Sequence, residues 1–455
     1  MSRAFRGLAA AFSRRTPGQA LALFAFANIV LFNLVFVPAV RSPIAATPVG
    51  LFADRFLRFR ADDDSAMAME PAYQHVLSGN REGLYEDVFE RQKVKFQYPP
   101  TSLLPWFALR TGPGAALLSI LGISFDFAQI LISWLCVLAT AAFSAAIFRV
   151  SWRQSGGIGA SPEAGALATG AVFVLALFFY PVLKGFALGQ VQVWIGAAFA
   201  AAFWCWLTGR AGVAGALLAV CAMIKPQLAL MFVLGLLRAD WPLCAGFLVT
   251  GLAGVGLSLL YSRPSDYGGY LRVLSRVSRY GEAYYPNQSV NGFLHRLLFN
   301  GDSTTWPRHG YPPYHPVVYA GTLISSLFFI AVSLWVRRRP RGIGRGADFA
   351  LAALVSTMAS PIAWEHHYGI LAPIFAFLVP PLWKFRPAGR WTMPTLAASY
   401  VLASNFIGKV SRFRTVPVAN VLQSYVLAAA LVVGVLLVLL RRMDPPVAIT
   451  EQTSA

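Results

Sequence analysis

The residues of this sequence that are best suited to catalysis are three consecutive aspartates, Asp62, Asp63 and Asp64. Adjacent carboxylates repel one another, so at least one should be easier to protonate than a free aspartate unless a cation or metal lies nearby. A carboxylate of that kind suits a general base that takes a proton from an attacking hydroxyl. The run would also suit a divalent metal, and a solvated acidic turn is the plain structural alternative.

A lysine and two histidines form a second group of candidates. Lys225 interrupts the apolar segment 211–237, and a lysine in hydrocarbon is costly unless it reaches water or an anion. His366 and His367 follow the end of another apolar run. A lipid-linked phosphate is an anion that these groups could bind. Adjacent helical residues point about 100° apart, so only one of the two histidines is expected to face the site squarely, and our choice is His367. The alternatives are a snorkelling lysine in a kinked helix and histidines that only cap a helix.

Two further segments predict unusual structure at a membrane surface. The stretch 95–106, KFQYPPTSLLPW, enters an apolar run through two prolines, each of which favours an extended residue before it. Such backbone at membrane depth occurs where it is buried in protein or lines a cavity, and a stiff joint between a loop and a helix is the alternative. The stretch 270–298 places Arg272, Arg276 and Arg279 at helical spacing beside apolar residues. That pattern predicts an amphipathic helix lying on the membrane.

Composition identifies the elements that must position these groups. The chain has 455 residues, is 57% hydrophobic and 13% charged, and contains repeated apolar runs of about 20 residues, the length that spans a bilayer. We therefore expect an all-α polytopic integral membrane protein, with residues 1–455 forming a single membrane domain. The net charge is +19, and the basic residues lie in short segments between apolar runs. That distribution is typical of membrane topology and argues against a nucleic-acid-binding protein. Four cysteines in or beside these runs predict buried thiols without a disulfide framework.

The distribution of arginine and lysine predicts the orientation of the chain. Arginines before the first apolar stretch, 18–40, and the basic segment RRRPRGIGR at 337–345 are inside signals. Both termini are then cytoplasmic, with a first outer loop at 41–98 and a large outer loop at 262–315. The interrupted segment 99–123 must cross an even number of times, which predicts a re-entrant or interfacial hairpin.

The same orientation gathers the titratable groups on one face. All six histidines fall in predicted outer segments. The first outer loop alone contains nine of the nineteen acidic residues. The segment 211–237 has an arginine at each end and is expected to turn near Lys225. Three basic residues, Lys409, Arg412 and Arg414, fall outside against the general rule. The chemistry of the protein is therefore expected at the outer face.

Five motifs in order resemble glycosyltransferase family 87. They are D…GLY…FQYPPTSLL, GQVQVW, GR..VAGALLAVCAMIKPQLAL, NQSVNGFLHRLL and SPIAWEHHYGIL, over about residues 62–369. That family comprises polyprenyl-phosphate-mannose-dependent mannosyltransferases of the GT-C superfamily. The resemblance implies a GT-C glycosyltransferase fold with about 10–12 transmembrane helices, plus a re-entrant hairpin and outer-surface loop helices. It also implies a bacterial-type cytoplasmic (inner) membrane location, an active site facing outside, and inversion at the anomeric carbon.

The resemblance assigns roles to residues of this chain. The family usually has one aspartate followed by aromatic residues, whereas three aspartates precede Ser65 here, and spacing favours Asp64 as the catalytic base with Asp63 next. Lys225 with His366 or His367 would hold the donor phosphate. A monophosphate leaving group needs less charge neutralisation than a nucleotide diphosphate, so we expect no obligatory metal and keep a divalent metal as the alternative. The remaining motif residues are expected to bind substrate: Tyr98, Gln190, Asn287, Gln288, Arg296, Trp364 and Glu365.

The resulting hypothesis is a membrane glycosyltransferase. Its donor would be a polyprenyl-phosphate sugar, with mannose the first choice, and its acceptor a glycolipid or glycan of the envelope; membrane lipids are the other expected partners. A lipid or sugar transporter or flippase is the main alternative, because it would explain many spans and an intramembrane lysine. A transporter predicts inverted repeats, and the sequence has no clear internal duplication. A non-catalytic scaffold for envelope assembly would need none of the outer carboxylates.

Overall fold

The computed structural model describes residues 16–443 apart from 32–47, 80–82, 158–161, 308, 337–339, 386, 388 and 417. The second half of the predicted first span (32–40), the N-terminal arginines, the start of the first outer loop and part of the basic segment at 337–345 therefore lie outside the described residues. Within the described residues the chain is helical, and its β pairing is limited to one antiparallel bridge between Asn287 and Trp364. This confirms the predicted all-α class.

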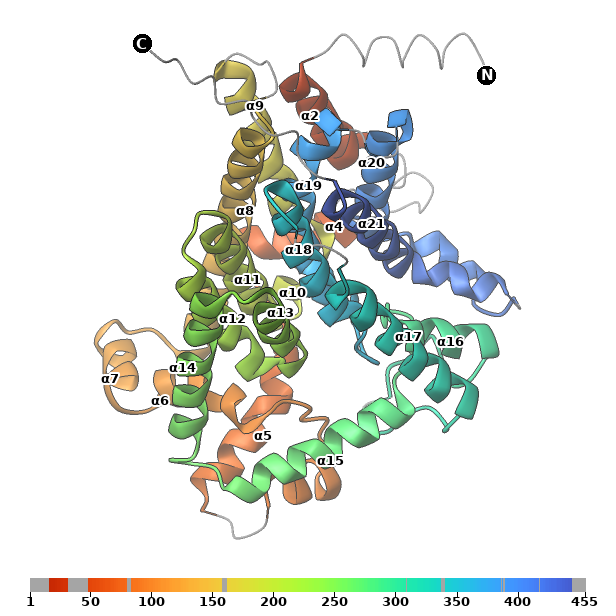
Figure 1. The fold of residues 1–455 in the computed structure, drawn as a ribbon. Helices are drawn as coiled ribbons and strands as arrows, with labels where there is room; N and C mark the ends of the chain where they lie inside the picture. Colours follow the sequence, from red (N-terminus) through yellow and green to blue (C-terminus); the bar gives the residue numbers. More distant parts are fainter. Residues whose placement is uncertain are drawn as a thin grey trace.

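The α-helices (Figure 1) are α2 (Pro17–Phe26), α4 (Pro48–Leu57), α5 (Asp64–Leu77), α6 (Leu104–Arg110), α7 (Gly112–Ile120), α8 (Phe125–Gln154), α9 (Pro162–Leu177), α10 (Tyr180–Ala187), α11 (Gln192–Leu207), α12 (Ala211–Ile224), α13 (Leu230–Arg238), α14 (Trp241–Ser258), α15 (Pro264–Tyr280), α16 (Val290–Leu298), α17 (Pro316–Leu334), α18 (Ile343–Met358), α19 (Leu371–Phe385), α20 (Thr392–Ala403) and α21 (Tyr425–Arg441). Short 3₁₀ or π-helical segments are η1 (Ala27–Leu31), η3 (Glu86–Arg91), η4 (Pro100–Leu103), η5 (Pro226–Ala229), η6 (Glu365–Ile370), η7 (Gly389–Trp391), η8 (Gly408–Phe413) and η9 (Ala419–Ser424).

Five of the described helices are long and apolar enough to cross a bilayer, or six if the bent pair α9 and α10 counts as one span. The described helices of sufficient length are therefore fewer than the predicted 10–12. Breaks inside apolar runs explain the difference, because they leave shorter apolar helices such as α11 and α12. Lys225 and Pro226 make one such break, since proline cannot continue a helix.

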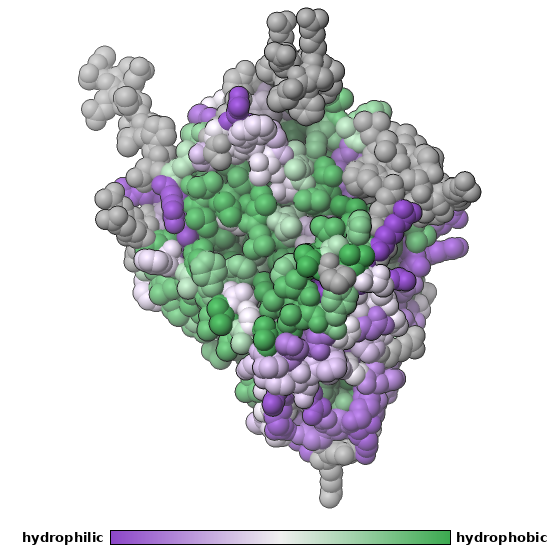
Figure 2. All heavy atoms as spheres, turned by 90° about the vertical axis from the view of Figure 1, so that its right-hand side faces the viewer, coloured by the Kyte–Doolittle hydropathy of each residue, from purple (hydrophilic) through white to green (hydrophobic). Residues whose placement is uncertain are grey.

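The surface divides into an apolar belt and a hydrophilic end. Figure 2 shows the belt across the face that it draws, and hydrophilic side chains below it, at the end where Figure 1 shows α5 and α15. On α17, the side chains of Ile324, Leu327 and Phe328 are about 60% exposed, at 67%, 59% and 61%. Exposed apolar side chains along a span are stable against lipid tails. The protein is therefore a multi-pass membrane protein, as predicted.

The chain reverses at Lys225, as the sequence predicts. Gly246, near the start of α14, packs so closely on α12 that a Cβ there would meet the carbonyl oxygen of Gly212. Trp206 precedes α12, and its indole nitrogen donates to Asp240, which follows α13, at 2.9 Å. The start of α12 and the end of α13 thus lie at the same end of the molecule. The segment forms a hairpin with Lys225 at its turn.

Basic residues gather at the end of the molecule opposite that turn. Arg238 donates to Asp348 at 2.7 Å, and Arg441 lies 3.3 Å from the same carboxylate. Arg345 lies over the ring of Trp206, 5.0 Å from its centroid. These residues belong to α13, α18 and α21, which the predicted topology brings to the cytoplasmic side. The assignment of this end to the cytoplasm stays a prediction.

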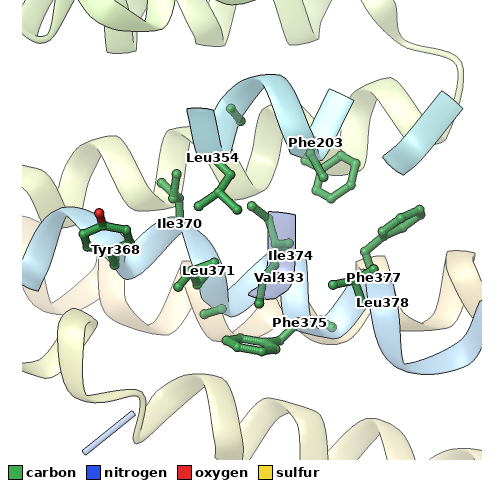
Figure 3. Close-up of a cluster of buried hydrophobic side chains, with 14 of the residues drawn as sticks. Phe203, Leu354, Tyr368, Ile370, Leu371, Ile374, Phe375, Phe377, Leu378 and Val433 are labelled. Carbon is green, nitrogen blue, oxygen red and sulfur yellow. The ribbon is translucent and has the colours of Figure 1, made fainter. Parts of the chain in front are cut away.

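The helix that carries the two histidines is the most enclosed of the candidate spans. Within Glu365–Phe385, which comprises η6 and α19, 78% of the apolar window is buried inside the protein. Figure 3 shows its side chains among those of α11, α18 and α21: Phe203, Leu354, Tyr368, Ile370, Leu371, Ile374, Phe375, Phe377, Leu378 and Val433. Such packing stabilises helices in lipid through van der Waals contact. It also keeps the polar start of η6 away from hydrocarbon.

The described parts of the two predicted outer loops, 41–98 and 262–315, form a cap, called the outer cap below, with α15 running across it (Figure 1). The helix is amphipathic as predicted, but its apolar face packs on protein, with Val273 and Val277 buried. Arg272 pairs with Glu86, and Arg276 donates to Glu90 at 2.7 Å. The apolar face and two of the arginines of this helix therefore join the two predicted outer loops, and its role as a membrane anchor stays a prediction.

The predicted hairpin at 99–123 appears as three short helices. η4 and α6 are followed at Gly112 by α7, which buries none of its residues. Gly114 approaches α6 so closely that a Cβ would meet the carbonyl oxygen of Ala108. The segment therefore doubles back, in agreement with the sequence prediction.

Candidate active site

A cavity of about 600 Å³ lies between the outer cap and the membrane helices. Its wall contains seven of the twelve residues predicted for the site: Asp64, Tyr98, Gln190, Lys225, Trp364, His366 and His367. These residues come from segments that are far apart in the sequence. The fold therefore brings the candidate base and the candidate phosphate-binding groups into one enclosure.

Asp64 is the member of the acidic run that faces the cavity. It begins α5, and its carboxylate accepts a hydrogen bond from the side-chain amide of Gln190 at 2.5 Å. The hydroxyl of Ser65 donates in turn to the side-chain oxygen of Gln190 at 3.1 Å. Burial raises the pKa of Asp64, the Gln190 hydrogen bond opposes that rise, and the charges of Asp62 and Asp63 add to it.

The other two aspartates are exposed and lie outside the cavity wall. Asp62 is paired with Arg55 at 2.7 Å, and Asp63 precedes α5 without making a side-chain cap. Gly189 fixes this arrangement, because it has a φ of +65° and a Cβ there would meet the carbonyl oxygen of Asp62. The geometry favours Asp64 over Asp63, in line with the spacing of the motif.

Lys225 and His367 form a contact pair in the cavity wall. A lysine ammonium can only donate, so Nε2 of His367 is the acceptor and its ring is neutral in this arrangement. The ring of His366 lies at 82° to that of His367, with 4.8 Å between centroids. Nε2 of His366 is enclosed and lacks a hydrogen-bond partner among the described residues. The nitrogen free for a ligand is therefore on His366, although the sequence reasoning preferred His367.

A second lysine, Lys184, lines the same cavity. It pairs with Glu365, which is fully buried and also accepts hydrogen bonds from the hydroxyls of Tyr180 and Tyr425, both at 3.2 Å. Glu365 is outside the cavity wall, so substrate contact by this residue was the wrong expectation. Lys184 escaped the sequence reasoning. It lies between two apolar runs, and the cost of placing a lysine in hydrocarbon, which singled out Lys225, applies to it as well.

Three other predicted substrate-binding residues are buried outside the wall. The side chain of Asn287 donates to the carbonyl of Pro361 at 3.1 Å and accepts the N–H of Ala363 at 2.9 Å. Gln288 donates to the carbonyl of Gln423 at 2.7 Å. Arg296 donates to Ser424, Asn287 and Tyr285.

These bonds correct the prediction for Asn287, Gln288 and Arg296. Their polar atoms are engaged by protein partners, so little capacity remains for a substrate. What they do instead is join the large outer loop to the strand-like segment before η6 and to η9. They therefore position the segment that carries Trp364, His366 and His367.

Tyr98 and Trp364 line the cavity as half-buried aromatic residues. Burial raises the pKa of Tyr98 to about 12, so its phenol stays protonated at neutral pH. Lys95 and Glu282 are further cavity residues that the sequence reasoning missed, and they form an ion pair at 3.1 Å. They are 187 positions apart in the sequence, and no spacing rule connects them.

The described residues contain no group of three or more His, Cys, Asp or Glu side chains that could hold a metal ion. Independence from metal stays a prediction. The four cysteines are free, and three of them are buried.

Comparison with known proteins places the chain in a family. A curated relative in Mycobacterium tuberculosis, described as a polyprenol-phosphate-mannose-dependent alpha-(1-2)-phosphatidylinositol pentamannoside mannosyltransferase, is 27% identical over 311 residues. The match covers 68% of this chain and 63% of that relative, so less than two thirds of the relative's length is represented. No solved structure matches the chain. The model of glycosyltransferase family 87 matches residues 96–361, more than half of the sequence, and this chain therefore belongs to that family.

Proposed function

We propose that this protein transfers mannose from a polyprenyl-phosphate donor to a glycolipid or glycan of the envelope. The reaction takes place at the outer face of a bacterial-type cytoplasmic membrane. One observation carries the proposal: a half-buried carboxylate, Asp64, shares a cavity with Lys184, Lys225 and His366. Membership of glycosyltransferase family 87 and the donor named for the relative support the choice of sugar and lipid.

Asp64 is the general base in this proposal. Its carboxylate accepts the proton of an acceptor hydroxyl while that oxygen forms a bond to the anomeric carbon of mannose. The bond from that carbon to the phosphate oxygen breaks on the opposite side, so the configuration inverts. The raised pKa of Asp64 supports this role, because a base works best when its pKa approaches the operating pH. Gln190 and Ser65 hold the carboxylate in place.

The leaving phosphate gains negative charge as the bond breaks. Lys184 and Lys225 supply positive charge in the cavity, and an Nε2–H of His366 can donate to a phosphate oxygen. Groups already fixed in a low-dielectric site stabilise such developing charge strongly. Glu365 holds Lys184, and His367 holds Lys225. The lipid chain of the donor remains in the bilayer beside the apolar belt.

Donor consumption by purified protein tests the proposal. Proteoliposomes are supplied with radiolabelled polyprenyl-phosphate mannose or GDP-mannose, with an envelope lipid extract as acceptor. Transfer from the lipid-linked donor alone is expected, and it should persist in EDTA, since metal independence is part of the proposal. A flippase would move the donor between leaflets without breaking it. Intact donor after incubation, or use of GDP-mannose instead, would contradict the proposal.

A further inference from the structure

Several residues that line the cavity take no part in the proposed transfer of mannose. Its lining residues come from the outer cap and the segment before η6: Lys95, Gln97, Glu282, Tyr284, Trp306 and Trp364. The groups assigned to the donor phosphate instead come from helices of the apolar belt or from breaks between them. The cavity therefore combines a cationic wall from the membrane helices with an aromatic wall from the outer loops.

The aromatic wall is polar but carries little net charge. Lys95 donates to Glu282 at 3.1 Å, and the Glu282 side chain is 1% exposed. The Lys95 ammonium also lies 5.1 Å from the ring centroid of Trp306 and 4.7 Å from that of Tyr311. Because the two charges offset each other, this ion pair offers hydrogen-bonding groups without net charge, while the exposed Lys93 is a further cation that lines the cavity from the outer cap.

Several aromatic rings stand beside that ion pair. Trp364 and Tyr284 meet edge to face, with 6.3 Å between ring centroids. The indole nitrogen of Trp306 is enclosed and has no hydrogen-bond partner among the described residues, so a ligand hydroxyl would satisfy it. Pyranose rings present C–H faces that pack on aromatic rings and hydroxyls that bond to neighbouring polar groups. Rings with a few convergent polar groups are typical of a small-ligand site.

We propose that this aromatic wall is the acceptor site and binds the uncharged pyranose ring that carries the attacking hydroxyl. The inference rests on the proposed function and adds the class of acceptor sugar to it. Trp306 is the platform for the ring, and Lys95 and Glu282 bind its hydroxyls. Asp64 lines the same cavity and receives the proton of one of them.

The test compares Trp306→Ala and Trp306→Phe with the wild-type protein. The donor is polyprenyl-phosphate mannose, and the acceptor probes are octyl α-mannoside and its anionic counterpart oxidised at C6, octyl α-mannuronide. Trp306→Ala should raise KM for octyl mannoside about tenfold, equivalent to about 1.4 kcal/mol, with KM for the donor unchanged. Trp306→Phe keeps a flat ring and should recover most of the loss. Trp391→Ala is the matched control, because Trp391 is 62% exposed and outside the cavity wall.

Slow transfer of mannose to water, measured without acceptor, reports that each variant is folded and binds donor. A wild-type protein that never consumes donor would refute the proposed function itself. If donor is consumed, three results would overturn the acceptor site: an unchanged acceptor KM in Trp306→Ala, a rise in donor KM instead, or preference for octyl α-mannuronide. Donor hydrolysis without use of octyl mannoside would also overturn the proposed sugar class.

Discussion

The buried ion pair between Lys184 and Glu365 allows stability and catalysis to be separated by mutation. The Glu365 side chain is 0% exposed and that of Lys184 is 12% exposed. In Glu365→Gln, the single amide oxygen can keep one of the two tyrosine hydrogen bonds, because Tyr180 and Tyr425 donate to different oxygens of Glu365, and the ammonium of Lys184 loses its charged partner. Removing one member of a buried pair costs about 3–5 kcal/mol. Because the Lys184 side chain reaches the cavity and is not fully buried, we expect the free energy of unfolding to fall by about 3 kcal/mol, the lower end of that range.

Lys184→Met should cost a similar amount, because Glu365 then keeps a buried charge with only two neutral donors. The double variant removes both charges and should be no less stable than either single variant, which gives a coupling energy of about 3 kcal/mol. Unfolding by SDS in mixed micelles, followed by the fluorescence of the twelve tryptophans, measures these free energies. Losses that simply add in the double variant would refute the pairing.

Activity should follow a different pattern from stability in the same set. Lys184→Met should reduce kcat in both the single and the double variant, because the charge offered to the leaving phosphate is absent from both. Glu365→Gln keeps that charge and should retain more activity per folded molecule. Recovery of kcat together with stability in the double variant would show that Lys184 acts only through folding.

Three further predictions concern the pH profile, the histidines and the topology. The rate should fall as pH decreases through the pKa of Asp64, at a pH above the ordinary aspartate value of 3.8, because the base must be ionised; a limb at or below that value in a kcat profile would contradict this. His366→Leu should raise donor KM more than His366→Gln does, since Gln retains a donor for the phosphate; equal, small effects on donor KM would assign the histidine a packing role. In a protein without native cysteines, Asp63→Cys should react with an impermeant maleimide on intact cells and Arg345→Cys should not, and the reverse pattern would overturn the topology.

Features that depend on local sequence could be predicted. The composition gave the all-α membrane class, and Lys225 with Pro226 gave the hairpin, because proline breaks a helix whatever surrounds it. The preference for Asp64 within the acidic run also agrees with the structure, since residues on either side of a helix start face different environments. The membrane class and the hairpin need only local sequence, whereas the choice of Asp64 came from the spacing of the family motif.

Features that depend on tertiary contacts could not be predicted. Lys184 meets Glu365 across 181 positions, and nothing in local spacing indicates which lysine has a carboxylate partner. Arg296 and Gln288 looked suited to a substrate because they are polar residues in a motif. Their burial among carbonyl groups of the outer loop and η9 makes them positioning residues. The arginines of α15 similarly looked suited to lipid headgroups, but Arg272 and Arg276 form ion pairs with Glu86 and Glu90.

Mannose transfer by Asp64→Asn, compared with Asp63→Asn, tests the central claim most directly. Both changes remove one carboxylate from the same acidic run, but only Asp64 lines the cavity. Burial raises the pKa of Asp64, so ionisation of this group opposes folding at neutral pH, and Asp64→Asn should not lower the thermal midpoint. We predict that Asp64→Asn is folded and loses at least about 100-fold in kcat, whereas Asp63→Asn transfers mannose at nearly the wild-type rate. An active Asp64→Asn variant, with or without an inactive Asp63→Asn, would contradict the account.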